Sequence, residues 1–298
     1  MGKLSDDQQS GVYAADIVCS CASLLGSLFV IIMYLGYKEI RSFSFRLVVY
    51  LSIFDSMYAI GILIGPTQSY TACMAQAIIV SYFPLGTIVW TNIIAFTLYK
   101  SIIQQIDMQK YEWKIILFGI LAPLPGTLLP LTTNSYGKAR FGECWIVIDD
   151  DRTNGIVWQL FQFYLPLWLG FIFNASCYYK VRHFVKVMMM HVQNDLDDAV
   201  KQQKLKLISR LKYYPLALIF CWFFATIDQI YLYSNYDDPS FGLALLDVSF
   251  GSSQGLLNAL IYGLNPVVMN AFMKSLHQCM PCVSYEDKGR EMEIATKV

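Results

Sequence analysis

Seven long apolar segments, separated by connectors that carry the charges, constrain this chain of 298 residues more than any other feature. The segments lie at residues 12–36, 45–65, 74–99, 113–133, 156–179, 212–234 and 242–267. About 20 predominantly apolar residues are enough to cross a bilayer as a helix. Only 15% of the residues are charged, against roughly 25% in soluble domains. The pattern predicts an all-α membrane protein whose one domain is a seven-transmembrane helix bundle.

The distribution of basic residues predicts how the bundle is oriented. Of the 22 lysines and arginines, 18 lie in the connectors of one side and in the tail, and four lie on the other side. Because cytoplasmic loops are enriched in Lys and Arg, we expect residues 1–11 to be an extracellular N-terminus of a cell-membrane protein. Residues 12–267 then form the transmembrane domain, and residues 268–298 form a cytosolic tail. The tail opens with "NAFMKSLHQCM", which predicts a short amphipathic eighth helix.

The eight cysteines fall at different depths. Cys73 opens the third segment and Cys144 lies in the second outer loop, so both are on the oxidising side, where a disulfide would persist. Such a bridge would clamp the loop over the bundle; the alternative is two free thiols. Cys279 and Cys282 follow the last segment on the cytosolic side, where juxtamembrane cysteines are often palmitoylated.

The seventh apolar segment has a small and polar face. At about 100° per residue, a helix gathers seven positions within a third of its circumference. These are Asp247, Gly251, Gln254, Gly255, Asn258, Tyr262 and Asn265. Leucines occupy the rest of the helix, and small residues let a neighbouring helix approach closely. The face therefore predicts a polar seam inside the bundle.

Asp55 is halfway along the second segment and is predicted to face Asn258 or Asn265 across this seam. A buried acid is costly in a membrane and usually marks a functional site. Pro266 frees a backbone carbonyl beside Asn265 and permits a kink. We interpret these four residues as a conformational switch, with water or a sodium ion between them. The alternative is a protonated Asp55 that only holds helices together.

Acidic residues gather where a ligand pocket would open. Asp228 and Asp247 lie toward the outer ends of their segments, and outer loops carry residues 149–151 and 237–238, all aspartates. An acidic mouth would attract cations and repel phosphates, although Arg140 and Arg152 would neutralise part of it. The predicted pocket comprises these two span aspartates and four aromatic residues, namely Trp222, Tyr231, Trp158 and Tyr82. For each aromatic residue, packing or an interfacial position is the alternative.

Local motifs resemble those of G-protein-coupled receptors. "SFRLVVYLSIFDSMYAIG" (44–61) resembles a receptor second helix with a carboxylate at mid-membrane. "TIVWTNIIAFTLYKSI" (87–102), "GECWIVIDDDR" (142–152) and "LKYYPLALIFCWFFATIDQIYLY" (211–233) together resemble the cyclic-AMP-receptor-like family first known from slime moulds. "QGLLNALIYGLNPVVM" (254–269) resembles the end of the seventh helix in that family.

The chain departs from rhodopsin-like receptors at three positions. Thr97-Leu98-Tyr99-Lys100 stands where those receptors have an acid-arginine pair, Phe224 replaces a proline, and Met269 replaces the tyrosine of N-P-x-x-Y. The resemblance is therefore closer to the cyclic-AMP-receptor-like family than to rhodopsin-like receptors.

The resemblance implies a receptor that binds an extracellular small molecule or peptide and activates a heterotrimeric G protein. The implied G-protein face includes Tyr99, Lys100, Lys206 and Arg210, with lipid head groups as the alternative contact. Arrestin-like proteins, or PDZ proteins at the terminal "TKV", are further expected partners. We expect no enzymatic activity, cofactor, metal or nucleic acid. The alternative function is a transporter of a small polar or cationic solute.

Overall fold

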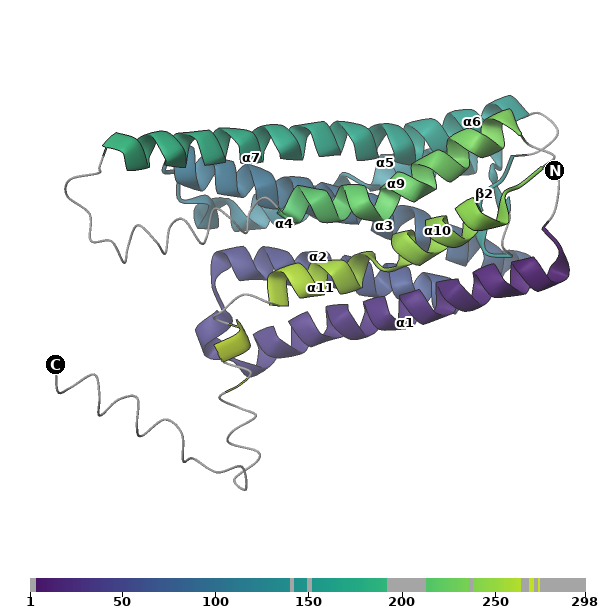
Figure 1. Ribbon diagram of the computed structural model, residues 1–298, viewed down its shortest axis with the longest axis horizontal. Coiled ribbons are helices and arrows are strands. Elements are labelled where there is room, and N and C mark those ends of the chain that lie inside the picture. Colours follow the sequence, from purple (N-terminus) through teal and green to yellow (C-terminus); the bar gives the residue numbers. More distant parts are fainter. Residues whose placement is uncertain are drawn as a thin grey trace, which may run out of the picture.

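The computed structural model describes residues 4–139, 142–148, 152–191, 213–235, 238–263, 268–270 and 273. Its α-helices are α1 (Asp6–Gly36), α2 (Phe43–Leu63), α3 (Tyr70–Ile103), α4 (Glu112–Leu121), α5 (Leu124–Leu128), α6 (Arg152–Gln159), α7 (Leu165–His191), α9 (Tyr213–Ser234), α10 (Phe241–Ser252) and α11 (Gln254–Gly263). Shorter turns are the 3₁₀ helices η1 (Lys38–Ile40), η2 (Met108–Tyr111) and η3 (Leu129–Thr133), and the π-helical η4 (Leu160–Tyr164). The helices run side by side along one long axis (Figure 1).

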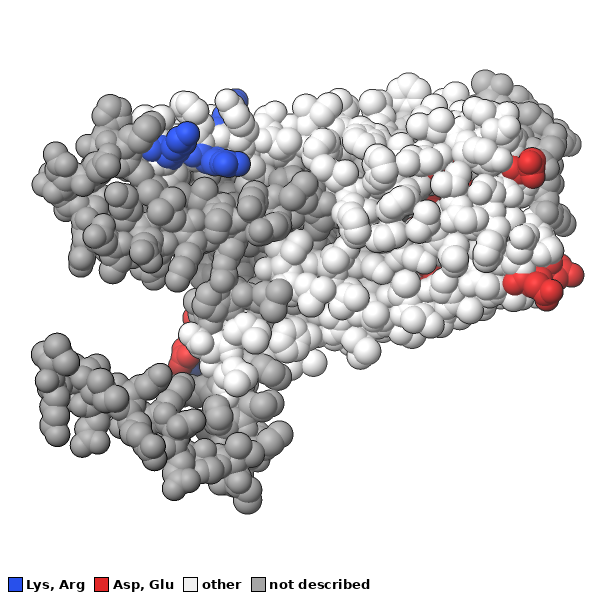
Figure 2. Space-filling model, in the orientation of Figure 1, with Lys and Arg blue, Asp and Glu red and all other residues white. Residues whose placement is uncertain are grey.

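Among the described residues, five helical segments are long and apolar enough to cross a membrane. They are Asp6–Gly36, Phe43–Leu63, Tyr70–Ile103, Met108–Thr133 and Asn154–Met188, and the shorter apolar helices are Leu218–Ser234 and Phe241–Ser252. Each of these segments overlaps one of the seven predicted spans, in agreement with the predicted bundle. Large apolar side chains such as Leu25 and Leu169 face outward, as a lipid-facing surface requires. A broad, nearly uncharged band separates the two charged ends in Figure 2.

α1 begins at Asp6, six residues before the predicted start of the first span. The reason is a capping box: the Ser5 hydroxyl accepts the Gln8 amide N–H, and the Gln8 side chain accepts the Ser5 N–H. These bonds satisfy amide groups that a helix N-terminus leaves without partners. Helix α1 therefore extends past the apolar segment from which its start was predicted.

Three predicted spans are interrupted rather than continuous. The fourth is divided into α4, α5 and η3 around its prolines, and the fifth contains η4 between α6 and α7. The seventh breaks at Ser253, where the hydroxyl donates to the Ser249 carbonyl at 2.6 Å. Gly251 and Gly255 flank the break and favour it, because glycine is a poor helix former. The kink predicted at Pro266 lies outside the described residues.

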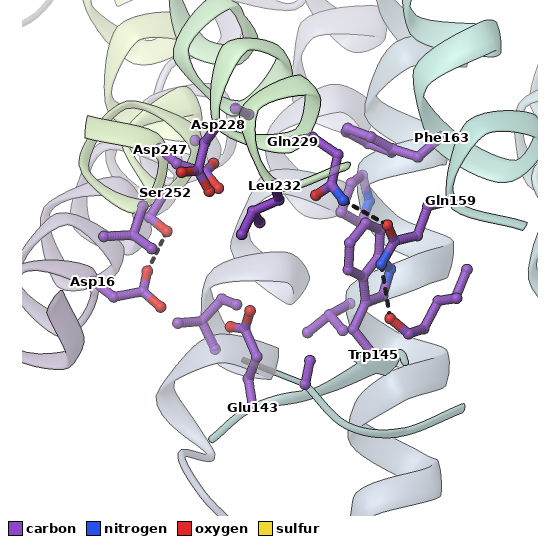
Figure 3. A pocket seen from close by; sticks show the side chains of 18 of the residues that line it. Asp16, Glu143, Trp145, Gln159, Phe163, Asp228, Gln229, Leu232, Asp247 and Ser252 are labelled. Carbon is purple, nitrogen blue, oxygen red and sulfur yellow. Dashed lines mark hydrogen bonds between the residues drawn. The ribbon is translucent and has the colours of Figure 1, made fainter. Parts of the chain in front are cut away.

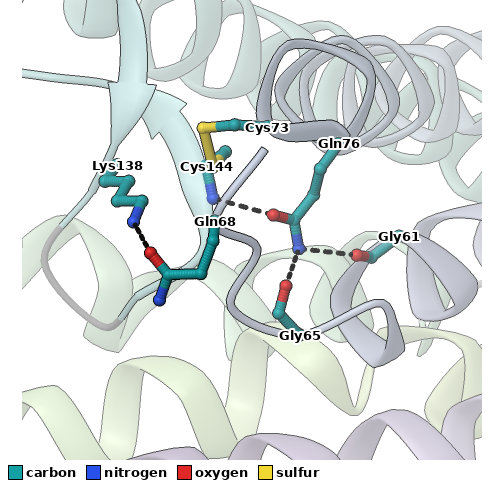
Figure 4. The surroundings of a disulfide bond; sticks show 7 residues. All are labelled: Gly61, Gly65, Gln68, Cys73, Gln76, Lys138 and Cys144. Atoms are coloured by element: carbon teal, nitrogen blue, oxygen red, sulfur yellow. Dashed lines mark hydrogen bonds between the residues drawn. A yellow bond between two sulfur atoms is a disulfide. The ribbon is translucent and has the colours of Figure 1, made fainter. Parts of the chain in front are cut away.

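A small β-hairpin is the exception to the all-α prediction. Strands β1 (Tyr136–Lys138) and β2 (Cys144–Ile146) pair antiparallel, with Gly137 opposite Trp145. Cys144 forms a disulfide with Cys73 at the start of α3, which confirms the predicted bridge (Figure 4). We call this end of the bundle, where α1 also begins, the disulfide end.

The buried amide of Gln76 adds a second clamp beside the disulfide. Its oxygen accepts the Cys144 N–H at 3.1 Å, and its nitrogen donates to the carbonyls of Gly61 and Gly65 at 3.0 and 3.3 Å (Figure 4). One side chain thus joins the hairpin, α3 and the end of α2. The hairpin is consequently a fixed wall of the bundle.

Candidate functional site

A cavity of about 490 Å³ opens at the disulfide end. Its walls come from α1, α2, α3, the hairpin and the segment after it, α6, η4, α9 and α10. Cavities of roughly 300–1,000 Å³ are typical of small-molecule sites. Because segments far apart in the sequence meet here, an occupant would touch most of the bundle at once.

Four carboxylates line the cavity, each from a different element. They are Asp16 on α1, Glu143 before β2, Asp228 on α9 and Asp247 on α10. In Figure 3 the three aspartates lie together on one side and Glu143 points into the cavity from below. Asp16 accepts a short hydrogen bond from Ser252. One of the described lining residues is a lysine, Lys138, which donates to the side-chain oxygen of Gln68 at 2.9 Å.

The carboxyl of Glu143 is a weaker acid than an ordinary glutamate side chain. Burial, and then the nearby carboxylates of Asp16 and Asp247, raise its pKa from 4.5 to about 8. Both causes act in the same direction, because desolvation and like charges disfavour the ionised form. Without an occupant, the cavity therefore holds Glu143 largely protonated at neutral pH.

The opposite wall is aromatic. Phe163 contacts Trp222 at 4.6 Å between ring centroids and Trp145 at 6.3 Å, both edge to face. Tyr164 extends this wall at 5.3 Å from Phe163, whereas Tyr58, whose ring is 6.4 Å from that of Trp222, lies beside Ser252 and the acids. Edge-to-face contacts between rings of this kind fix their relative orientation. The wall therefore presents ordered ring surfaces to the cavity.

Buried glutamines connect the aromatic wall to the hairpin. Gln159, the last residue of α6, donates to the Ile146 carbonyl at 2.9 Å and accepts from Gln229 at 2.7 Å and from Tyr233 at 3.0 Å. Gln229 and Tyr233 both belong to α9. Gln159 thereby ties α9 to the loop that the disulfide holds. The π turn η4 follows directly, and such turns often mark functional sites.

Trp222 lies where the cavity meets the broken seventh span. Its indole N–H donates to the Gln254 side-chain oxygen at 2.6 Å, and Gln254 is the first residue of α11. Both side chains are buried. An occupant that displaced the indole would therefore act directly on the break between α10 and α11.

Asp55 is at the centre of the predicted polar seam. Its carboxylate accepts from Thr87 at 3.0 Å and from Asn258 at 2.8 Å, and it is 3% exposed. The seam is tight, because a Cβ on Gly255 would come within 2.5 Å of the hydroxyls of Ser23 and Ser27. The predicted contact between Asp55 and Asn258 is thus present, and the small residues do admit a neighbouring helix.

The structure brings together half of the predicted pocket residues. Trp222, Asp228 and Asp247 line the cavity, whereas Tyr231, Trp158 and Tyr82 do not. At 100° per residue, Tyr231 points about 120° away from the middle of the α9 face that lines the cavity, which comprises positions 222, 225, 228, 229 and 232. Trp158 donates to the Thr133 hydroxyl, and Tyr82 donates to the Ile120 carbonyl. Hydrogen bonds to the fourth span hold these last two rings outside the cavity.

At the opposite end, two predicted G-protein contacts can be placed. Lys180 lies over the ring of Tyr99 at 5.6 Å, and Lys100 donates to Gln104 at 2.8 Å. The remaining predicted residues lie outside the described part of the chain; they are Lys206, Arg210, Asn265, Pro266, Cys279 and Cys282.

The sequence analysis missed four polar cavity residues, namely Asp16, Glu143, Gln159 and Gln229. Asp16 had a usable signal, because it is an acid within an apolar span and shares a helix face with Ser20, Ser23 and Ser27. Glu143 had none, since an acid in a loop is ordinarily solvated. The two glutamines become recognisable only when α6 and α9 are seen together.

Comparison with known proteins settles the family. The family model described as "Slime mold cyclic AMP receptor" matches residues 4–284. The chain belongs to this family. "G-protein coupled receptor 1" of Arabidopsis thaliana is 30% identical over 288 residues, covering 94% of this chain and 86% of that protein. The chain is therefore a receptor of the G-protein-coupled kind.

Two further matches concern the family and the fold. "Cyclic AMP receptor-like protein A" of Dictyostelium discoideum is 25% identical over 262 residues, covering 86% of this chain but only 64% of that protein. The crystal structure of squid rhodopsin has a TM-score of 0.73 at 15% identity, covering 100% of this chain and 93% of that one. At that identity the likeness to rhodopsin shows the seven-helix fold alone.

Proposed function

We propose that the receptor takes an extracellular agonist into the disulfide-end cavity and signals to a heterotrimeric G protein at the opposite end. The observation that carries the proposal is the composition of the cavity wall. α9 contributes Trp222, Asp228, Gln229 and Leu232 to it, while the facing hairpin is clamped to α3. A bound ligand would thus contact both the hairpin, which is fixed to α3, and the wall formed by α9.

The orientation follows from the basic residues. The connectors and tail predicted to lie away from the disulfide hold 18 of the 22 lysines and arginines, and by the positive-inside rule this distribution supports an extracellular N-terminus and cavity. An extracellular disulfide agrees with this orientation, because the cytosol keeps thiols reduced. The G protein would then meet Tyr99, Lys100, Lys206 and Arg210.

Coupling between the two ends is a population shift. An agonist that binds better when α9 is displaced favours that arrangement, and a G protein that prefers the same arrangement gains affinity. The hydrogen bond from Trp222 to Gln254 and the pairing of Asp55 with Asn258 are the contacts that would differ between the two arrangements. We also propose palmitoylation of Cys279 and Cys282, and lipid, arrestin-like or PDZ partners for the tail.

Filling the cavity tests the proposal. We would reconstitute the full chain in nanodiscs and measure GDP release from a panel of heterotrimeric G proteins, with cyclic AMP, cationic amines and peptides as probes. A Cβ on Gly251 makes only ordinary contacts, with its nearest atom, of Trp222, at 3.6 Å, so Gly251→Leu should project into the cavity. We expect it to abolish the response to any probe that stimulates the wild type.

Gly242→Leu is the matched control, because Gly242 belongs to the same helix, has open space around it and does not line the cavity. It should respond as the wild type does. A probe that still stimulates Gly251→Leu would place the agonist site elsewhere. If no G protein in the panel releases GDP faster with the receptor, with or without a probe, the proposed function is wrong.

A further inference from the structure

We propose that the disulfide-end cavity selects a protonated amine joined to a planar apolar body and discriminates against nucleotide phosphates. This inference rests on the proposed function in one respect: it takes the agonist cavity as the binding site and names the chemical class of its ligand. Two features of the cavity carry it, namely the charge of one wall and the aromatic character of the other.

The first feature is the excess of acid. Among the described residues that line the cavity, four carry a carboxylate and one, Lys138, is a lysine. The lysine donates to the side-chain oxygen of Gln68. Among the described residues, the charges that act on Glu143 are the carboxylates of Asp16 and Asp247. Asp16 has a neutral partner, the Ser252 hydroxyl. In a partly desolvated space, carboxylates that crowd one another are stabilised by an added cation and destabilised by an added anion.

The second feature is the placement of the rings opposite the acids. Trp145 and Phe163 lie across the cavity from Asp16 and Asp247 in Figure 3. A ligand with an ammonium group at the acidic side would therefore lay its body against ring faces. Stacking on Trp or Phe favours a flat apolar body, and Trp is also the ring with the strongest cation–π attraction. A cavity of about 490 Å³ has room for such a molecule.

Because the proposed ligand is a cation, its affinity should depend on pH. Because a bound cation favours ionised Glu143, amine binding should expel a proton from this carboxyl. Affinity for an amine should then rise with pH toward the pKa of about 8, while affinity for an anion should fall. The other titratable groups that line the cavity are Asp16, Tyr58, Lys138, Tyr164, Asp228 and Asp247.

Three indoles of matched shape test the proposal with purified full-length receptor in nanodiscs. Tryptamine carries an ammonium group, tryptophol a neutral hydroxyl and indole-3-propionate a carboxylate on a comparable chain. Thermal stabilisation at pH 6, 7 and 8 reports binding without any G protein, and cyclic AMP is the fourth probe. We expect tryptamine to stabilise the receptor most, with an affinity that increases from pH 6 to pH 8.

Variants assign the effect to the cavity. Glu143→Gln should weaken tryptamine binding about tenfold and flatten its pH dependence, and Asp247→Asn should also weaken binding about tenfold. Asp238→Asn, an exposed acid in a loop of the same end, is the matched control and should bind as the wild type does. Trp145→Leu should weaken tryptamine and tryptophol alike, because it removes the ring and leaves the charges.

Several outcomes would overturn the inference. Equal stabilisation by all three indoles would mean that the cavity selects the ring and not the charge. Stronger binding of cyclic AMP or indole-3-propionate, or no stabilisation by tryptamine, would also contradict it. If another probe still drives GDP release, only the ligand class is wrong. If tryptamine binds but no ligand ever changes GDP release, the ligand class stands and the proposed function fails.

Discussion

The receptor buries acids in two regions, the seam at Asp55 and the cavity at the disulfide end, and the two regions differ in their partners. Asp55 accepts hydrogen bonds from Thr87 and Asn258. Glu143 instead lies within the influence of Asp16 and Asp247, which carry the same charge. Burial alone therefore does not reveal what an acid does. A carboxylate with donors stabilises one arrangement of the helices, whereas one among carboxylates leaves binding energy for a cation.

The largest effect is expected where the partnered acid is removed. Asp55→Leu would leave the Thr87 hydroxyl and the Asn258 amide buried without their acceptor, at a cost of about 3 kcal/mol in the free energy of unfolding. Asp55→Asn keeps an acceptor and should cost less. Thermal unfolding of the receptor in nanodiscs measures both.

The same acid-to-amide change at Asp16 in the cavity should have a smaller effect on stability. Asp16→Asn can still accept from Ser252 and removes one charge from the crowded wall, so it should not lower the unfolding temperature. A loss as large as that of Asp55→Asn would show that the two regions are not different.

Loss of the disulfide should have an effect of similar size. Cys73→Ser and Cys144→Ser should each lower stability by about 2–4 kcal/mol, because the unfolded chain gains freedom when the bridge is lost. The double variant should cost little more than either single one, since both remove the same bond. Additive losses in thermal unfolding would contradict a shared bridge. The seam should be insensitive to this change, so Asp55→Asn should add its own cost independently.

The last effect is a change of stability with pH rather than with a substitution, and it should be confined to the cavity. In the folded chain the pKa of Glu143 is raised from 4.5 to about 8, so the folded state binds a proton that the unfolded state has released. Stability of the unoccupied receptor should therefore fall as pH rises from about 4.5 to about 8. Glu143→Gln should flatten this slope in thermal unfolding. A slope that persists in the variant would mean that another group titrates.

Much of the fold could be predicted from the sequence, because transmembrane helices are encoded locally in apolar length. The disulfide was predictable from the side on which its cysteines lie, and the contact of Asp55 with Asn258 followed from the polar face of one helix. The break at Ser253 was not, since glycines on a close-packing face are equally compatible with a continuous helix. The early start of α1 depends on a capping box outside the apolar segment.

The cavity could be predicted only in part, for a geometric reason. Position along the sixth span placed Asp228 toward its outer end and Trp222 at mid-depth, but it could not exclude Tyr231 without knowing which neighbours α9 has. The π turn η4 adds a residue to one turn, which rotates α6 against α7 and cannot be read from composition. Glu143 acquires its unusual acidity only when the loop folds over α1 and α10.

Measurements on one variant from each acidic region test whether the two regions perform different tasks. Tryptamine affinity and basal GDP release would be measured on Glu143→Gln and Asp55→Asn in the same nanodisc preparation. The account predicts that Glu143→Gln loses amine affinity about tenfold, whereas Asp55→Asn changes basal GDP release and changes affinity much less. Equal changes of affinity in the two variants, or a shift of basal GDP release caused by Glu143→Gln alone, would contradict it.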